Sequence, residues 1–146
     1  MRLRLSTRAR YGLKAMVDLA AEEGTEPVAV NTLAERQGVS VAYLEQLIAQ
    51  LKKAGLVTSV RGAQGGYRLS RAPEQITVGE VLTALEGSTA LVDCVALSSS
   101  GCENACSCSA RPLWLKLQSR IDEVLNNTTI RDMAEDYITQ KRRMES

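Results

Sequence analysis

Histidine is absent from all 146 residues of this chain. Its absence removes both the commonest general base of enzymes and the commonest nitrogen ligand of metal sites. Any metal bound here must use thiolate, carboxylate or backbone ligands. The sequence also lacks a paired-carboxylate motif and a nucleotide-binding loop, so no catalytic constellation can be assembled from it and we expect that the protein is not an enzyme.

Aromatic residues are also scarce, with no Phe, one Trp and four Tyr. The core must therefore be aliphatic and rich in alanine, which suits helices. The sequence contains no run of about 18 apolar residues and no signal-peptide pattern. We therefore expect a cytoplasmic protein without a membrane partner, long enough for one domain or one and a half.

Positive charge is concentrated in the first half of the chain. Residues 1–71 hold 11 Lys and Arg against 6 Asp and Glu, a net charge of +5, whereas residues 72–146 hold 7 against 11, a net charge of −4. A basic half joined to an acidic half is typical of a DNA-facing module attached to a dimerising or sensing module. Ordinary surface charge is the alternative explanation for a difference of this size.

The segment 32–68 gives the strongest indication of fold. A short helix is predicted over Thr32–Gln37, opened by a capping box of Thr32 with Glu35 and closed by Gly38. A longer helix follows over Val41–Ala54. Two helices joined by a short glycine-containing turn predict a helix-turn-helix, although a simple bundle of short helices explains them equally well.

The longer helix has two unlike faces and a natural N-cap in Ser40. One face has the apolar spacing of a buried stripe and consists of Leu44, Leu47, Ile48 and Leu51. The other face is suited to hydrogen bonding and carries Ala42, Tyr43, Glu45, Gln46, Ala49, Gln50 and Lys53.

A tight hairpin predicted over Val57–Leu69 distinguishes the two explanations. Arg61 stands at the mouth of its turn, as it would in a wing beside a DNA backbone; the turn contains Gly62, Gly65 and Gly66. A plain helical bundle leaves this hairpin unexplained. We therefore predict a winged helix-turn-helix DNA-binding domain over residues 1–75.

The other predicted elements of the chain rest on capping residues and periodicity. A first helix is capped by Ser6 or Thr7, and a short strand over Pro27–Val30 is expected to pair with the wing. A linker follows over Arg71–Gln75. A capping box of Thr77 with Glu80 then opens a helix whose inward face consists of Val78, Val81, Leu82 and Leu85.

A long amphipathic helix predicted over Ala110–Asn126 dominates the second half. Its wide apolar face consists of Leu113, Trp114, Leu117, Ile121, Val124 and Leu125. This width indicates packing against a second subunit, and burial in the protein's own core is the alternative. Thr129 and Asp132 begin a last helix, and we expect the terminal KRRMES to fray. The predicted fold is thus mainly α, with a cysteine-containing sensor loop and dimerisation helices over residues 76–146.

All four cysteines lie in one non-periodic segment, with the spacing Cys94-x7-Cys102-x3-Cys106-x-Cys108. Disulfides are disfavoured in a reducing cytoplasm. The spacing contains no C-x2-C pair and differs from the ferredoxin patterns. Thiolates suit an iron–sulfur cluster or zinc, so the spacing alone leaves open a metal site, redox thiols or incidental cysteines.

Several motifs together resemble the Rrf-two family of bacterial winged-helix regulators, and most closely its iron–sulfur cluster regulator (IscR-like) branch. They are MRL and RYGLKAM near the N-terminus, then ERQGVS, YLEQL, GLVTSVRG, GGY and VGEV, and finally LW in the long helix and LNNTT at its end. The resemblance covers about residues 1–130.

The resemblance implies a homodimer whose long helices cross and whose Val41–Ala54 helices enter the major groove of double-stranded DNA. The family's DNA-reading positions correspond to Ser40, Tyr43, Glu45, Gln46 and Arg61. Their chemistry fits this role, because Gln46 can pair bidentately with adenine and Glu45 can accept from cytosine N4. The remaining candidate DNA-binding residues are Arg2, Arg10, Gly62, Gly65, Gly66 and Tyr67.

The resemblance also implies a [2Fe–2S] cluster with ligands at Cys94, Cys102 and Cys108. The family's fourth ligand, a His, is replaced here by Arg111, which has no lone pair to offer iron. Cys106 is the first candidate for the fourth ligand. The other candidates are Asp93 and Glu103. An all-thiolate site would carry more negative charge, and hence a lower reduction potential, than one with a neutral His.

The leading hypothesis is a DNA-binding transcription regulator that senses iron–sulfur status, or redox or nitric oxide stress, through this cluster. The alternative is a cluster-free regulator of cysteine or sulfur metabolism. It would act through an enzyme of cysteine synthesis or through the reactive thiols of Cys106 and Cys108. Operator DNA, a second copy of the chain, and iron–sulfur assembly or cysteine-synthesis proteins are the expected partners.

Overall fold

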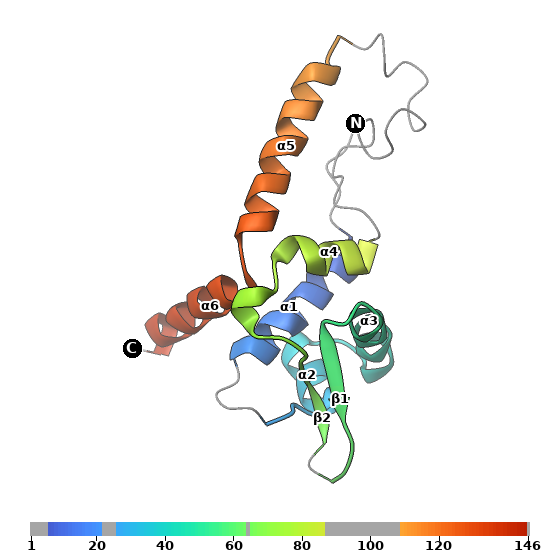
Figure 1. Cartoon of the computed structure of the whole chain (residues 1–146). Coiled ribbons are helices and arrows are strands. Elements are labelled where there is room, and N and C mark those ends of the chain that lie inside the picture. The colour runs from blue at the N-terminus through green and yellow to red at the C-terminus, as the bar shows by residue number, and fades with distance from the viewer. Residues whose placement is uncertain (1–5, 22–25, 64, 87–108, 146) are drawn as a thin grey trace.

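The computed structural model of the chain describes residues 6–21, 26–63, 65–86 and 109–145. The described elements are, in order, α1 (Thr7–Ala21), α2 (Val30–Gln37), α3 (Val41–Lys53), β1 (Val57–Val60), β2 (Gly66–Leu69), the 3-10 helix η1 (Pro73–Gln75), α4 (Val78–Glu86), α5 (Arg111–Asn127) and α6 (Ile130–Glu145). Figure 1 shows α5 leaving one end of the body and the hairpin β1–β2 leaving the other. The predicted mainly α fold with a winged helix-turn-helix is confirmed.

The start of α2 differs from the prediction. The helix begins at Val30, two residues before Thr32, and its N-cap is Ala29, which makes no side-chain capping bond; the capping box of Thr32 with Glu35 is therefore wrong. Pairing of Val28 with Tyr67 of the hairpin explains the shift. The Val28 N–H donates to the Tyr67 carbonyl and the Tyr67 N–H to that of Val28, at 2.9 and 2.8 Å. The helix begins directly after this bridge.

The same bridge corrects the strand predicted over Pro27–Val30. The segment does pair with the wing, but through the single bridge Val28–Tyr67. Gly66, next to Tyr67, has no room for a side chain, because a Cβ there would overlap the Val28 carbonyl oxygen. A glycine is thus required where the hairpin crosses this segment.

The turn between α2 and α3 follows the predicted pattern. Gly38 has a left-handed backbone, with φ of 69°, and its N–H bonds to the carbonyl of Glu35 at 3.2 Å. This conformation is accessible to glycine without steric cost. Ser40 then caps α3, its Oγ accepting from the Tyr43 N–H at 3.1 Å. These two residues end one helix and begin the next within a short turn.

The wing is a two-stranded antiparallel hairpin, as predicted. Strand β1 pairs with β2 in a register that places Val57 opposite Leu69 and Val60 opposite Gly66. Val57 is buried, so the strands are attached to the core at their base. The Lys52 Nζ donates to the Ser59 Oγ at 2.9 Å and joins the end of α3 to β1.

The buried core is aliphatic, as the composition predicts. Its largest fully buried side chains are Met16, Leu33, Leu44, Leu47, Ile48, Leu51, Leu56, Ile76, Val81 and Ile130. The set includes residues from both predicted domains, 1–75 and 76–146, so the two segments pack together; their separate functions stay a prediction. The predicted inward face of α4 is confirmed, since Val78, Val81, Leu82 and Leu85 are buried.

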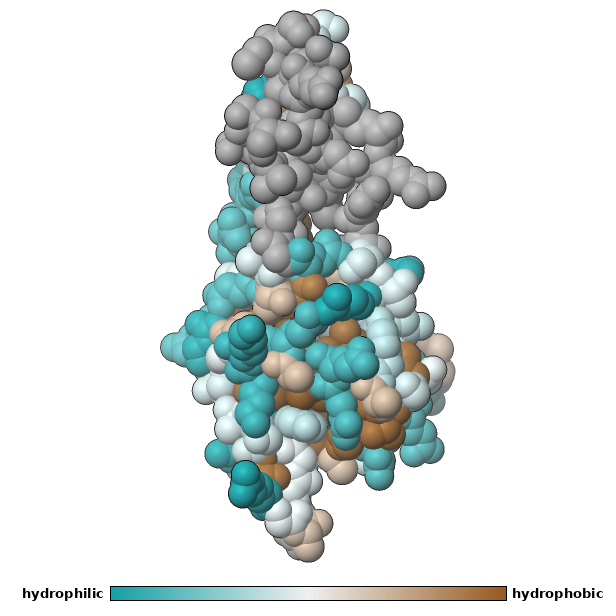
Figure 2. All heavy atoms as spheres, turned by 90° about the vertical axis from the view of Figure 1, so that its right-hand side faces the viewer, coloured by the Kyte–Doolittle hydropathy of each residue, from teal (hydrophilic) through white to brown (hydrophobic). Residues whose placement is uncertain are grey.

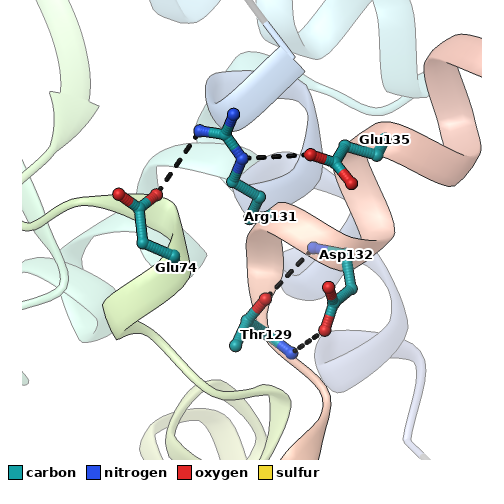
Figure 3. Close-up of polar contacts among 5 residues, drawn as sticks. All are labelled: Glu74, Thr129, Arg131, Asp132 and Glu135. Atoms are coloured by element: carbon teal, nitrogen blue, oxygen red, sulfur yellow. Dashed lines mark hydrogen bonds and ion pairs between the residues drawn. The ribbon is translucent and has the colours of Figure 1, made fainter.

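Helices α5 and α6 meet the body at a joint between Ile76–Val78 and Thr128–Ile130, and α6 also packs against α1. The Val78 N–H donates to the Thr128 carbonyl and the Ile130 N–H to the Ile76 carbonyl, both at 2.9 Å. Figure 3 shows the start of α6, where Thr129 and Asp132 cap each other reciprocally at 3.0 and 3.1 Å. The predicted start of the last helix is therefore confirmed.

An exposed ion-pair network surrounds this joint. Arg131 of α6 reaches Glu74 of η1 at 3.5 Å and Glu135 at 3.1 Å (Figure 3). The hydrogen bond that Arg131 donates to the Glu135 carboxylate, together with the charges of Glu74 and Glu135, raises the pKa of Arg131 above its usual value. Arg131 is thus charged at every physiological pH, and solvent screening keeps these surface pairs weak.

The C-terminal residues correct two further expectations. Helix α6 continues to Glu145, so KRRMES does not fray before that residue; Arg142 and Arg143 lie in its last turn, where the helix dipole favours cations. On α5, Leu113 is 58% and Val124 63% exposed. Burial of the whole predicted apolar face in the protein's own core is therefore wrong for these two positions.

Candidate nucleic-acid interface

Helix α3 divides into a buried and an exposed face as its sequence predicts. Leu44, Leu47, Ile48 and Leu51 anchor it, each at most 1% exposed. Glu45 and Gln46 lie between these anchors in sequence and are exposed. Because the apolar stripe is fully packed, the helix cannot rotate without losing core contacts, and the direction of its polar face is set by the fold.

Exposed polar residues lie near both ends of α3. Ser40 and Glu45 are exposed near its start, and Lys52 and Lys53 near its end. Figure 2 faces the side on which α3 lies in Figure 1 and shows hydrophilic side chains interleaved with apolar ones. This is a surface that can hydrogen-bond to base edges and phosphates rather than pack against a hydrophobic partner.

The wing presents Arg61, Gly62 and Ala63, all of them exposed, at the end of β1. The turn is closed by the Gly65 N–H, which donates to the Gly62 carbonyl at 3.0 Å. A Cβ at Gly65 would overlap the Val60 carbonyl oxygen, so this glycine has a backbone role. Arg61 is therefore carried on a narrow, tightly turned hairpin that a DNA groove could accommodate.

The remaining predicted DNA-binding residues have different surroundings. Arg10 is exposed on α1, where its Nη2 donates to the Thr7 Oγ1 at 3.4 Å. Tyr67 is half-buried, packs against the core and pairs with Val28. Arg2 lies outside the described residues. The structure thus places Arg10 on a free surface and gives Tyr67 a structural contact, and DNA binding by these residues stays a prediction.

Two residues of α1 extend this surface, although the sequence reasoning missed them. Tyr11 meets the Tyr43 ring edge to face, with centroids 6.4 Å apart. Lys14 is exposed and places its Nζ 5.0 Å from the Tyr11 centroid. The spacing of Tyr11 and Lys14 could have indicated a pair on one helix face. The contact between Tyr11 and Tyr43 joins two different helices, so no local sequence pattern could have indicated it.

The predicted metal ligands Cys94, Cys102, Cys106 and Cys108 all lie outside the described residues. Within the described part of the chain, no group of three or more acidic or cysteine side chains is arranged to hold a metal ion. Arg111, which the resemblance predicts in place of a His ligand, is the first residue of α5 and is half-buried. Metal binding by the four cysteines stays a prediction.

No helix in the described ranges has both the length and the apolar character that are needed to span a membrane. The fold and the surface of α3 together define a winged helix-turn-helix DNA-binding protein.

Comparison with known proteins identifies the family. Residues 5–136 match the family Rrf2, described as "Iron-dependent Transcriptional regulator". The HTH-type transcriptional regulator IscR of Sodalis glossinidius is 43% identical over 131 residues, which cover 90% of this chain and 78% of that protein. IscR of Vibrio cholerae is 42% identical over 135 residues, covering 92% and 76%. The chain belongs to the Rrf2 family of transcription regulators, and it is not an enzyme.

Solved structures agree with this assignment and include both IscR and CymR proteins. T. potens IscR shares 44% identity with a TM-score of 0.74, covering 92% of this chain and 88% of that one. CymR, the global cysteine regulator of B. subtilis, shares 40% identity with a TM-score of 0.77, covering 91% and 97%. The fold is therefore common to an IscR and to a CymR protein.

Proposed function

We propose that a homodimer of this chain reads operator DNA with α3 in the major groove and the wing along the minor groove. The observation that carries this proposal is the two-faced α3. Its apolar stripe is at most 1% exposed, whereas Glu45 and Gln46 are exposed; the wing that carries Arg61 is joined to the same helix by the Lys52–Ser59 hydrogen bond. Glu45 and Gln46 would read cytosine and adenine edges, and Arg61 would reach a base edge or a phosphate. Ser40, Tyr43 and Arg10 would complete the contact surface.

The homodimer part of the proposal is supported by α5. Leu113 and Val124 are separated by about three helical turns and so share one face. Both are more than half exposed on a helix that extends away from the body (Figure 1). Apolar side chains on such a helix are normally covered by a partner. A second copy of α5 offers the same stripe and would cover it.

We further propose that the chain senses iron–sulfur status, or redox or nitric oxide stress, through a [2Fe–2S] cluster. Cys94, Cys102 and Cys108 would hold the cluster, with Cys106 as the fourth ligand. The donor set fits, because thiolates bind iron–sulfur clusters and Arg111 cannot substitute for them. When bound, the cluster would supply a charge that changes when the cluster is oxidised, reduced or lost.

The joint at Ile76–Val78 and Thr128–Ile130 would connect the two ends of the protein. It ties the lower end of α5 to the start of α4 by two backbone hydrogen bonds of 2.9 Å. Gly79 permits this close approach, since a Cβ there would press against the Asn126 side chain. A change in the direction of α5 would therefore move the DNA-binding body with it. In this proposal residues 1–75 bind DNA, and residues 76–146 sense and dimerise.

The test is to isolate the full chain anaerobically and measure iron, acid-labile sulfide and visible absorption. The Cys94→Ala, Cys102→Ala, Cys108→Ala triple variant should be colourless and iron-free. Its affinity for duplexes that the wild type selects from a random pool should differ from that of the wild type. A triple variant that binds iron and DNA as the wild type does would disprove cluster sensing. The single variant Cys106→Ala tests the fourth ligand, and Ser109→Ala is its matched control.

The likeness to CymR favours a second function, a cluster-free regulator of cysteine or sulfur metabolism. The fold matches the cysteine regulator of B. subtilis, and it also matches Staphylococcus aureus CymR in an oxidized form at 36% identity and a TM-score of 0.73. The chain would then act through a cysteine-synthesis enzyme or through the Cys106 and Cys108 thiols. A colourless anaerobic preparation that retains a biosynthetic enzyme, or in which mass spectrometry shows these thiols oxidised by peroxide, would support it.

A further inference from the structure

The ring of Tyr43 on α3 meets a second ring from a different helix. The Tyr11 ring of α1 lies with its centroid 6.4 Å from that of Tyr43, and the two planes meet at 87°. Lys14, on the next turn of α1, places its Nζ 5.0 Å from the Tyr11 centroid. Lys14, Tyr11 and Tyr43 thus form a continuous set of contacts, the aromatic bridge, from α1 to α3.

Each contact of the aromatic bridge has a favoured geometry. The edge of an aromatic ring is electropositive and its face electronegative, so rings prefer to meet edge to face. The same quadrupole attracts an ammonium group to the face of the Tyr11 ring. Tyr11 is half-buried against the core, whereas Lys14 is exposed. Tyr11 is therefore held by its packing against the core and by the Lys14 ammonium over its ring.

Tyr43 lies where a recognition helix enters DNA. Its N–H donates to the Oγ of Ser40, the N-cap, at 3.1 Å, so it belongs to the first turn of α3. The N-terminal residues of such helices are the ones that contact base edges. The backbone of Tyr43 is thus fixed by the cap, while the orientation of its ring is constrained by Tyr11.

We infer that Tyr11 is a positioning residue for DNA recognition: it holds the Tyr43 ring in its DNA-contacting orientation before DNA arrives. The inference rests on the proposed reading role of α3. A side chain that is already ordered loses less conformational entropy on binding, and this difference appears as affinity. The gain applies only to complexes in which Tyr43 makes its contact. Tyr11 should therefore affect binding to selected DNA more than binding to arbitrary DNA.

The experiment measures the affinity of the full chain for two duplexes of equal length. One duplex is selected by the wild type from a random pool, and the other is an unselected sequence. The variants are Tyr11→Leu, Tyr43→Leu, the double variant and Tyr11→Phe. Thermal unfolding of each variant reports separately on stability. Tyr11→Met replaces Tyr11→Leu if the latter does not fold.

Tyr11→Leu should weaken binding to the selected duplex about three- to tenfold, the range expected for loss of one aromatic pair. Binding to the unselected duplex depends mainly on phosphate contacts and should change less than about twofold. Tyr11→Phe keeps the ring and should bind as the wild type does. The double variant should bind no more weakly than Tyr43→Leu alone, because Tyr11 acts through Tyr43.

Equal losses on both duplexes, or additive losses in the double variant, would overturn the inference, because Tyr11 would then act on the fold alone. Gln46→Ala and Arg61→Ala separate this failure from that of the proposed function. If they weaken binding to the selected duplex and Tyr11→Leu does not, only the inference is wrong. If Gln46→Ala and Arg61→Ala both leave binding to the selected duplex unchanged, the reading role of α3 and the inference are both wrong.

Discussion

Ile130 donates its backbone N–H to the carbonyl of Ile76 at 2.9 Å, and both side chains are completely buried. The two residues lie more than 50 positions apart in the sequence. One belongs to the segment just before α4 and the other to the start of α6. Their contact joins the start of α6 to the core of the DNA-binding body, and it should be sensitive to loss of volume.

Ile130→Ala should lower the free energy of unfolding by about 2–5 kcal/mol, because it removes buried methyl groups and leaves a cavity. Denaturant unfolding at one fixed protein concentration measures this, since a dimer's stability depends on concentration. Met144→Ala is the control: the Met144 side chain is 87% exposed. It should change stability by less than about 0.5 kcal/mol. Equal effects of the two variants would show that the joint is not part of the core.

Gly66→Ala should destabilise the protein by about 1–3 kcal/mol, the usual cost of forcing extra atoms into a packed site. The added Cβ would overlap the Val28 carbonyl oxygen and separate β2 from Val28. Denaturant unfolding gives the stability, and fluorescence anisotropy with DNA gives the affinity, which should fall because the wing is displaced. Ala63→Ser, at an exposed position of the same turn, is the control. Wild-type stability of Gly66→Ala would mean that the Val28–Tyr67 bridge does not constrain the wing.

Local signals in the sequence were sufficient to predict most of the DNA-binding body. The apolar spacing of α3 is a property of one helix, so it correctly predicts which face is buried and leaves Glu45 and Gln46 exposed. Gly38 and Ser40 act within a few residues of their own positions, and they end and begin helices as expected. The wing was likewise predictable from its glycine-rich turn.

Contacts between distant segments account for what the sequence did not predict. Helix α2 begins early because Val28 pairs with Tyr67, and nothing in the sequence around Thr32 reports that pairing. Tyr11 was missed for the same reason, since its partner Tyr43 lies on another helix. The apolar stripe of α5 predicts a partner surface but does not say which one. The predicted roles of the four cysteines, whose positions the structure does not describe, stay predictions.

Charges on the exposed stripe of α5 should separate the proposed homodimer. Leu113→Asp combined with Val124→Asp would place a carboxylate on each side of the expected interface, where burial of an unpaired charge is unfavourable. Sedimentation equilibrium should show the wild type as a dimer and the double variant shifted towards the monomer. Ser119→Asp, at an exposed position on the same helix, is the control and should remain dimeric. A double variant that sediments as the wild type does would place the dimer interface elsewhere.

Gln46 and Arg61 should contribute to DNA binding in different ways. Gln46→Ala should lose about 1–3 kcal/mol of binding free energy at one base position and relax the preference there, because a bidentate contact with adenine is removed. If Arg61 contacts a phosphate, Arg61→Ala should weaken binding to all sequences and reduce the slope of log affinity against log salt by about one. Selection from a random duplex pool, followed by anisotropy titrations at several salt concentrations, measures both effects.

Gln75→Ala is the matched control for these two variants, since Gln75 is exposed on η1 and belongs neither to α3 nor to the hairpin β1–β2. It should leave both the selected sequence and the salt slope unchanged. The structure distinguishes the two test residues because Gln46 projects from a helix locked by its buried stripe, whereas Arg61 is carried on a turn. Gln46→Ala is therefore the variant that should lose base preference. If Gln46→Ala selects the same sequences as the wild type with the same affinity, α3 is not the element that reads the operator.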